Sequence, residues 1–148
     1  MKPAHSILLV EDNPADVKIT QRALKQCGLE IDLIVARDGE EALDYLLRRG
    51  PYESAPNWRR PELVLLDINL PRLDGHEVLS RLRSNPEYRT VPVVVLTTSR
   101  RPQDVERMYG SGANTYIEKP PEFARFVEVL RTIHQYWLET AVLPAPCA

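Results

Sequence analysis

An α/β fold with a doubly wound, mostly parallel sheet is predicted by an alternation along the chain. Short uninterrupted apolar runs at residues 7–10, 63–66 and 93–96 are typical of parallel strands that are buried on both faces. Longer segments with helical periodicity separate these runs, as expected for βα units. The chain has 148 residues, of which 43% are hydrophobic, and this length suits one domain with one core.

The first two βα units carry clear helix signals. Asn13 followed by Pro14 is a favourable N-cap with proline at the first helical position. Gly28 suits the C-terminal stop of the same helix, and the next helix has an apolar stripe at steps of three and four. The expected elements are a strand at 7–10, a helix at 14–28, a strand at 33–36 and a helix at 40–49.

A long loop and three further units follow. Residues 50–61 carry three prolines and break all periodicity, so we expect a surface loop there. The elements expected after it are strands at 62–66, 92–96 and 115–118, and helices at 76–83, 102–110 and 122–140. Residues 1–140 are thus one predicted domain. We expect the tail, residues 141–148, to be disordered or to dock only in an assembly.

Polar residues at the strand ends point to a functional site. Five such residues follow four of the predicted strands: Glu11 and Asp12, Asp67, Thr97 and Lys119. Taken singly, each has an ordinary structural explanation, such as charge at a helix N-terminus or a turn. Ligands of doubly wound sheets, however, bind at the carboxyl ends of the strands. The set therefore predicts one shared crevice.

The acidic members of this set favour a bound cation. Glu11, Asp12 and Asp67 would repel one another and raise each other's pKa values if no cation lay between them. Mg²⁺ fits best, because it takes oxygen ligands and commonly binds one or two carboxylates together with a phosphate. We therefore expect a phosphoryl group to visit this site.

Four segments, ILLVEDN, LLDINLP, VVVLTTS and GANTYIEKP, resemble the receiver domains of two-component response regulators. The resemblance covers residues 5 to about 135 and implies a flavodoxin-like (βα)5 fold with strand order 2-1-3-4-5. It also implies that Asp67 accepts a phosphoryl group and that Lys119 pairs with the phosphate. The implied ligands of Mg²⁺ are Glu11, Asp12, Asp67 and the main-chain carbonyl of Asn69.

The resemblance also implies a switch. Thr97 would donate its hydroxyl to the new phosphate oxygens, with Thr98 as the competing hydroxyl. Tyr116 matches the switch aromatic of the family, the alternative being an ordinary buried aromatic of the fifth strand. The Lys119–Pro120 bond resembles one that is cis in the family, whereas trans is the general preference of X-Pro bonds.

Partners are implied by two additions to a minimal receiver. The insertion at 50–61 and the long fifth helix resemble the stand-alone response regulators that pair with bacterial and cyanobacterial phytochrome histidine kinases. A sensor histidine kinase is therefore the expected partner. Signalling is expected through the face of helix four, strand five and helix five. Tyr136, Trp137 and Leu138 would be costly to expose, so we also expect a homodimer through the helix-five side.

Several classes of protein are disfavoured. The formal net charge is -2, and the paired arginines are interleaved with acids, so nucleic acid is not an expected partner. The longest apolar runs fall far below the roughly 18 residues that span a bilayer. Cys27 and Cys147 are too few for a disulfide scaffold, and a cytoplasmic protein is therefore expected.

Rival functions on the same architecture fit the local chemistry less well. A phosphatase of the haloacid-dehalogenase type would need a second aspartate where Asn69 stands, and a flavin carrier would need a hydroxyl-rich loop where EDNPAD stands. A phosphorylation-independent adaptor would not need the full set of site residues. We expect a phosphoacceptor rather than an enzyme, with Asn69 and Ser99 flanking the water that removes the phosphoryl group.

Overall fold

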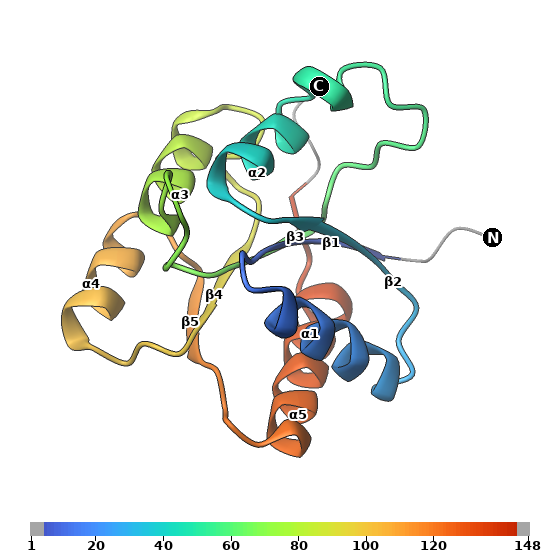
Figure 1. Ribbon diagram of the computed structural model, residues 1–148, viewed down its shortest axis with the longest axis vertical. Helices are drawn as coiled ribbons and strands as arrows, with labels where there is room; N and C mark the ends of the chain where they lie inside the picture. The colour runs from blue at the N-terminus through green and yellow to red at the C-terminus, as the bar shows by residue number, and fades with distance from the viewer. Residues whose placement is uncertain (1–4, 145–148) are drawn as a thin grey trace.

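The computed structural model describes residues 5–144 and contains one five-stranded parallel sheet. The strand order is β2-β1-β3-β4-β5, with every neighbouring pair parallel, and Figure 1 shows helices on both sides of it. The predicted fold class and strand order are confirmed. The strands are β1 (His5–Val10), β2 (Ile31–Ala36), β3 (Leu63–Leu66), β4 (Val93–Thr97) and β5 (Thr115–Glu118).

Two helical layers cover the two faces of the sheet. The helices are α1 (Pro14–Gln26), α2 (Gly39–Leu46), α3 (Gly75–Ser84), α4 (Pro102–Gly110) and α5 (Phe123–His134). One apolar cluster joins the sheet to α1 and α5, and a second joins it to α2, α3 and α4. In β1, Ile7 belongs to the first cluster and Leu8 to the second. Burial on both faces thus explains why the central strands are uninterrupted apolar runs.

Most element boundaries lie within two residues of the predicted ones. The fourth helix and the fifth strand match the prediction. The second helix is one exception, because it ends at Leu46 rather than at residue 49. Arg48 has a φ of 53°, a left-handed conformation that cannot continue an α-helix. A short 3-10 turn, η1 (Gly50–Tyr52), follows in the predicted loop.

The insertion at 50–61 is folded against the second helix. The Trp58 indole Nε1 donates to the Tyr45 carbonyl at 2.8 Å, and the Tyr45 hydroxyl donates to the Arg59 carbonyl at 2.7 Å. The Arg48 guanidinium lies 4.7 Å from the centre of the Trp58 ring. These contacts anchor the loop on α2. The loop leads into the first residue of β3, so it lies at the amino end of that strand and not at the carboxyl ends where the crevice was predicted.

The C-terminal helix is not one continuous α-helix. It ends at His134 and continues as a π-helical segment, η2 (Gln135–Thr140). Trp137 and Leu138 pack against the apolar cluster of α1 and α5. Both are half-buried on the single chain, so less of their surface is exposed than expected, while Tyr136 is 53% exposed.

The first residues of the tail lie against the domain. Leu143 and Pro144 line a cavity of about 230 Å³ together with Pro61 and Pro92. The rest of the predicted tail, residues 145–148, lies outside the described residues. In the described part of the chain, no helix combines the length and apolar character that crossing a bilayer requires.

Candidate functional site

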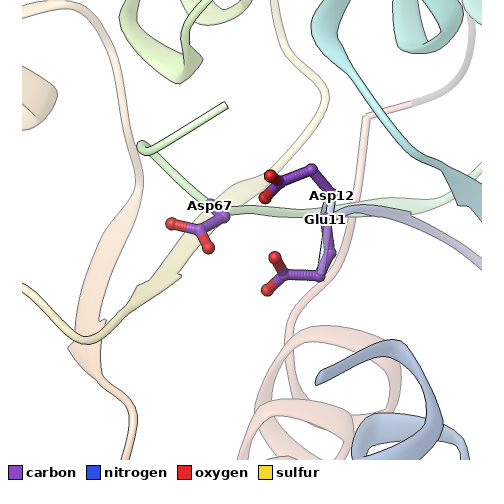
Figure 2. Close-up of side chains that lie close together, drawn as sticks. All are labelled: Glu11, Asp12 and Asp67. Carbon is purple, nitrogen blue, oxygen red and sulfur yellow. The ribbon is translucent and has the colours of Figure 1, made fainter. Parts of the chain in front are cut away.

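Three carboxylates meet at the carboxyl ends of two neighbouring strands. Glu11 and Asp12 follow β1, and Asp67 follows β3, which pairs directly with β1. One ligand oxygen from each lies within 4.8 Å of the others. Figure 2 shows the three side chains close together. Glu11 is buried and Asp12 is exposed. The sequence prediction that these residues come together is confirmed, because neighbouring parallel strands end at the same edge.

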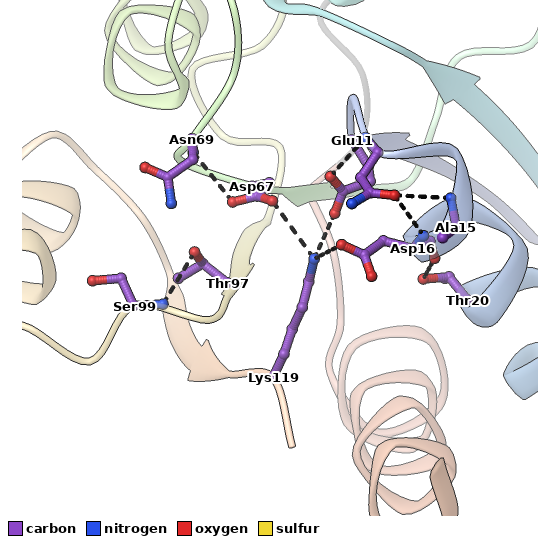
Figure 3. Close-up of polar contacts among 10 residues, drawn as sticks. Glu11, Ala15, Asp16, Thr20, Asp67, Asn69, Thr97, Ser99 and Lys119 are labelled. Atoms are coloured by element: carbon purple, nitrogen blue, oxygen red, sulfur yellow. Dashed lines mark hydrogen bonds and ion pairs between the residues drawn. The ribbon is translucent and has the colours of Figure 1, made fainter. Parts of the chain in front are cut away.

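The ammonium group of Lys119 faces this acidic cluster. The Lys119 Nζ atom lies 2.5 Å from Glu11 Oε1, 3.5 Å from Asp67 Oδ2 and 3.7 Å from Asp16 Oδ2 (Figure 3). The Lys119 backbone N–H donates to the Thr97 carbonyl at 2.7 Å, which ties the residue to the end of β4. The described peptide bonds include no cis bond, so Lys119–Pro120 is trans.

Burial and charge shift the pKa values of the central pair. Burial is the main reason why the pKa of Glu11 is raised to about 7. The negative charge of Asp67 raises this pKa further, whereas the hydrogen bond from Lys119 lowers it. Burial alone would lower the pKa of Lys119, but its hydrogen bond to Glu11 and the charges of Asp67, Glu11 and Asp16 raise it overall. The site therefore holds its lysine charged and carries an excess of carboxylates.

Hydroxyl side chains lie at the carboxyl end of β4, the strand next to β3. Thr97 is fully buried as the last residue of β4, whereas Thr98 is exposed. The Ser99 backbone N–H donates to Thr97 Oγ1 at 3.4 Å, and the Ser99 hydroxyl donates to Asp104 at 2.6 Å. The Tyr116 hydroxyl donates to the Ser99 carbonyl at 2.9 Å. Tyr116 is thus linked to the loop between β4 and α4 that carries Thr97.

The loop after β3 curves closely around Asp67. The Asn69 backbone N–H donates to Asp67 Oδ1 at 3.2 Å. A Cβ atom on Gly75 would lie 2.5 Å from the Asp67 carbonyl oxygen, so a side chain there would force the first turn of α3 away from Asp67. Glycine at position 75 therefore lets α3 begin next to the end of β3.

Asp16 is a site residue that the sequence analysis missed. It lies in the first turn of α1, which begins directly after the acidic pair. A signal was available, because a helix that starts at the carboxyl end of a strand points its first turn toward the same crevice. An acid in a first turn is also common for reasons of helix stability alone, so the position of Asp16 does not by itself indicate a site.

The donor set fits a hard divalent cation. All three clustered side chains offer carboxylate oxygens, which Mg²⁺ and Ca²⁺ prefer. Glu11, Asp67 and Asp16 contact one ammonium, and Asp12 lies beside the first two, so the described contacts leave negative charge uncompensated. A bound cation would remove that electrostatic cost.

Comparisons with known proteins agree with this geometry. The profile of the response regulator receiver domain matches residues 7–131. The response regulator Rcp1 of Synechocystis sp. is 43% identical over 143 residues, which are 97% of this chain and 95% of the relative.

Two solved structures are similar over nearly the whole chain. One is the phosphorylated cyanobacterial phytochrome response regulator RcpA, with a TM-score of 0.87, 41% identity, and coverage of 96% of this chain and 100% of that one. The other is the Mn²⁺-bound form of response regulator Rcp1, with a TM-score of 0.83, 42% identity, and coverage of 95% and 99%. A divalent cation and a phosphoryl group thus occur in close relatives.

Proposed function

The chain belongs to the response regulator receiver domain family, and from that premise we propose that it is a phosphoacceptor switch with Asp67 as the phosphorylated residue. The observation that carries the proposal is the position of the Asp67 carboxylate. It lies at the end of a central strand, within reach of two other carboxylates and 3.5 Å from the Lys119 ammonium. We treat residues 1–140 as one receiver domain and 141–148 as a tail.

The proposed reaction is a phosphoryl transfer from a histidine of a sensor kinase. An oxygen of Asp67 attacks the phosphorus, the phosphorus–nitrogen bond breaks, and its electron pair stays on the histidine nitrogen. The product is an acyl phosphate, which later hydrolyses. Lys119 supplies positive charge to the transferred oxygens, as such transfers require. The Thr97 hydroxyl donates a hydrogen bond to an oxygen of the same phosphoryl group. The chain thereby assists its own phosphorylation and dephosphorylation.

Mg²⁺ is the proposed cofactor. Its ligands would be Glu11, Asp12, Asp67 and the main-chain carbonyl of Asn69. When bound, it would offset the charge that develops on the phosphoryl oxygens. We expect a chelator to stop phosphoryl incorporation, and added Mg²⁺ to restore it. Incorporation that continues at the same rate in the chelator would contradict this role.

The expected partner is a phytochrome-type sensor histidine kinase. The support is similarity: a relative with 41% identity is a phytochrome response regulator. Phosphoryl transfer from candidate purified kinases, with and without light, would test the pairing. Transfer from several unrelated kinases at equal rates would count against a phytochrome partner.

Phosphorylation is proposed to change the face formed by α4, β5 and α5. Tyr116 on β5 is hydrogen-bonded to the Ser99 carbonyl, so movement of Thr97 and its loop would reach that face. We further propose a homodimer through the α5 side, with exposed Tyr136 in the contact. Analytical ultracentrifugation of the wild type and Tyr136→Ser is the test. A monomer at tens of micromolar, with and without phosphoryl group, would contradict dimerisation.

The lifetime of the phosphoryl group is proposed to depend on Asn69 and Ser99. Both flank the site, and the Ser99 hydroxyl is held by Asp104 at 2.6 Å. Replacing each with a bulkier residue should change the rate of dephosphorylation. An unchanged rate in both variants would contradict their placement beside the attacking water.

The central experiment is incubation with acetyl phosphate and Mg²⁺, followed by intact-mass measurement. Wild-type protein should gain one phosphoryl group, and Asp67→Asn should gain none. Asp74→Asn is a matched control, since Asp74 caps α3 close by and asparagine caps helices equally well. Undiminished incorporation in Asp67→Asn would overturn the assignment. No incorporation in the wild type would favour the adaptor alternative.

A further inference from the structure

Asp16 contacts the Lys119 ammonium from a different side than Asp67 does. The two carboxylates lie at 3.7 Å and 3.5 Å from Nζ, and Figure 3 shows their ion pairs leaving the nitrogen in different directions. Glu11 takes a third position at 2.5 Å. The ammonium is therefore shared among three anions.

The first turn of α1 fixes the place of Asp16. Its backbone N–H donates to Asn13 Oδ1 at 3.4 Å, and its carbonyl accepts from the Thr20 hydroxyl at 2.9 Å. The side chain is 37% exposed, compared with 12% for Asp67. Asp16 is thus held by the helix cap, and it reaches Lys119 from the solvent side.

We propose that Asp16 is a positioning residue: it holds the Lys119 ammonium toward α1 and so limits the positive charge offered to a phosphoryl group at Asp67. The inference rests on the proposed phosphoacceptor function and adds a residue that tunes it. Asp16 is not a member of the three-carboxylate group within 4.8 Å. Its role is therefore separable from that of the proposed metal ligands.

The competition follows from the distances. Two carboxylates at nearly equal distance attract the same ammonium with nearly equal Coulomb energy before screening. The greater exposure of Asp16 weakens its attraction, because solvent screens exposed pairs. Removing its charge should therefore shift Lys119 toward Asp67 without releasing it from Glu11.

Asp16→Asn is the test variant, since asparagine keeps the size and remains acceptable near a helix start. With acetyl phosphate as donor and Mg²⁺ constant, we expect the KM to fall about threefold and the maximal rate to change little, as suits a partly exposed ion pair. The difference in KM between Asp16→Asn and the wild type should become smaller at high ionic strength. Asp16→Glu, which keeps the charge, should stay nearer to the wild type than Asp16→Asn does.

Two controls separate positioning from a general effect of charge. Glu77→Gln removes an acid from the first turn of α3, where its partner is Arg81 rather than Lys119, and should leave the KM unchanged. In a Lys119→Met background, Asp16→Asn should no longer lower the KM. An unchanged KM in the single variant would overturn the proposal. An equal decrease in KM on adding Asp16→Asn to the wild type and to the Lys119→Met variant would also overturn it.

A separate readout distinguishes failure of this inference from failure of the proposed function. The ¹⁵Nζ resonance of Lys119, observed by NMR without donor, should shift in Asp16→Asn and not in Glu77→Gln. Absence of that shift would overturn the positioning role even if Asp67 is phosphorylated. A wild type that shows the Lys119 contact but takes up no phosphoryl group would overturn the proposed function instead.

Discussion

Two half-buried cations of this protein, Lys119 and Arg83, have different kinds of hydrogen-bonding partner. Lys119 faces carboxylates: Glu11, Asp67 and Asp16. Arg83, near the end of α3, makes its hydrogen bonds to uncharged oxygens. Its acceptors are the carbonyls of Tyr88, Arg89, Val91 and Gly112, and the side-chain oxygen of Asn114.

The two sites differ in how much charge and hydrogen-bonding capacity remains without a partner. The planar guanidinium of Arg83 fits fixed carbonyls and joins α3 to the segments before β4 and β5. Burial lowers the pKa of Arg83, whereas that of Lys119 is raised by its anions despite burial. Arg83 is thus a saturated structural contact. Lys119 sits among more negative charge than it can neutralise, so its site can take up a cation or rearrange around a phosphoryl group.

The largest expected effect on stability is at Arg83. Arg83→Met leaves several carbonyls without a donor and should lower the free energy of unfolding by about 3 kcal/mol. Chemical denaturation would measure it. Arg81→Met on the same helix is the control, because the Arg81–Glu77 pair is exposed and such pairs contribute little. Equal effects of the two substitutions would remove the contrast between Arg83 and an ordinary surface arginine.

The next effect is cation-dependent. Mg²⁺ at about 100 times its Kd should raise the free energy of unfolding of the wild type by about 2.7 kcal/mol. Asp12→Asn should lose most of that gain because it removes a proposed ligand. Thermal unfolding with and without chelator is the measurement, and Arg81→Met should respond as the wild type does. A full response in Asp12→Asn would place the cation elsewhere.

A smaller effect of opposite sign is expected without cation. In the chelator, Asp12→Asn should be more stable than the wild type by about 1 kcal/mol, since it relieves repulsion among carboxylates. The same denaturation experiment shows whether this is so. A less stable variant would mean that the acidic cluster is not strained in the free protein.

The smallest expected effect concerns His134, a third basic group. Burial lowers its pKa, an effect that Glu139 at 3.4 Å opposes and His5 supports. The folded state therefore binds the proton less readily than the unfolded state, and the contribution of His134 to stability should fall as the pH drops below about 6.5. The difference in the free energy of unfolding between the wild type and His134→Gln, measured from pH 7.5 to 5, isolates the contribution of His134. A difference independent of pH would contradict the shift.

Part of the site was predictable because it follows from topology. Once Glu11 and Asp67 are assigned to the ends of parallel strands, both must lie at one edge of the sheet. The contacts of Asp16 and Arg83 were not predictable in the same way. They depend on where helices begin and on which loops approach them. The half-burial of Trp137 and Leu138 against the cluster of α1 and α5 likewise depends on tertiary packing.

The sequence by itself determined the alternation of strands and helices, the burial of the central strands and the edge at which the carboxylates gather. Periodicity and chain direction are local properties, and local sequence encodes them. Only the tertiary structure decided that Lys119 is shared among Glu11, Asp67 and Asp16. Those distances depend on the packing of α1 and of the segment after β5 against the same sheet edge, which no single segment specifies.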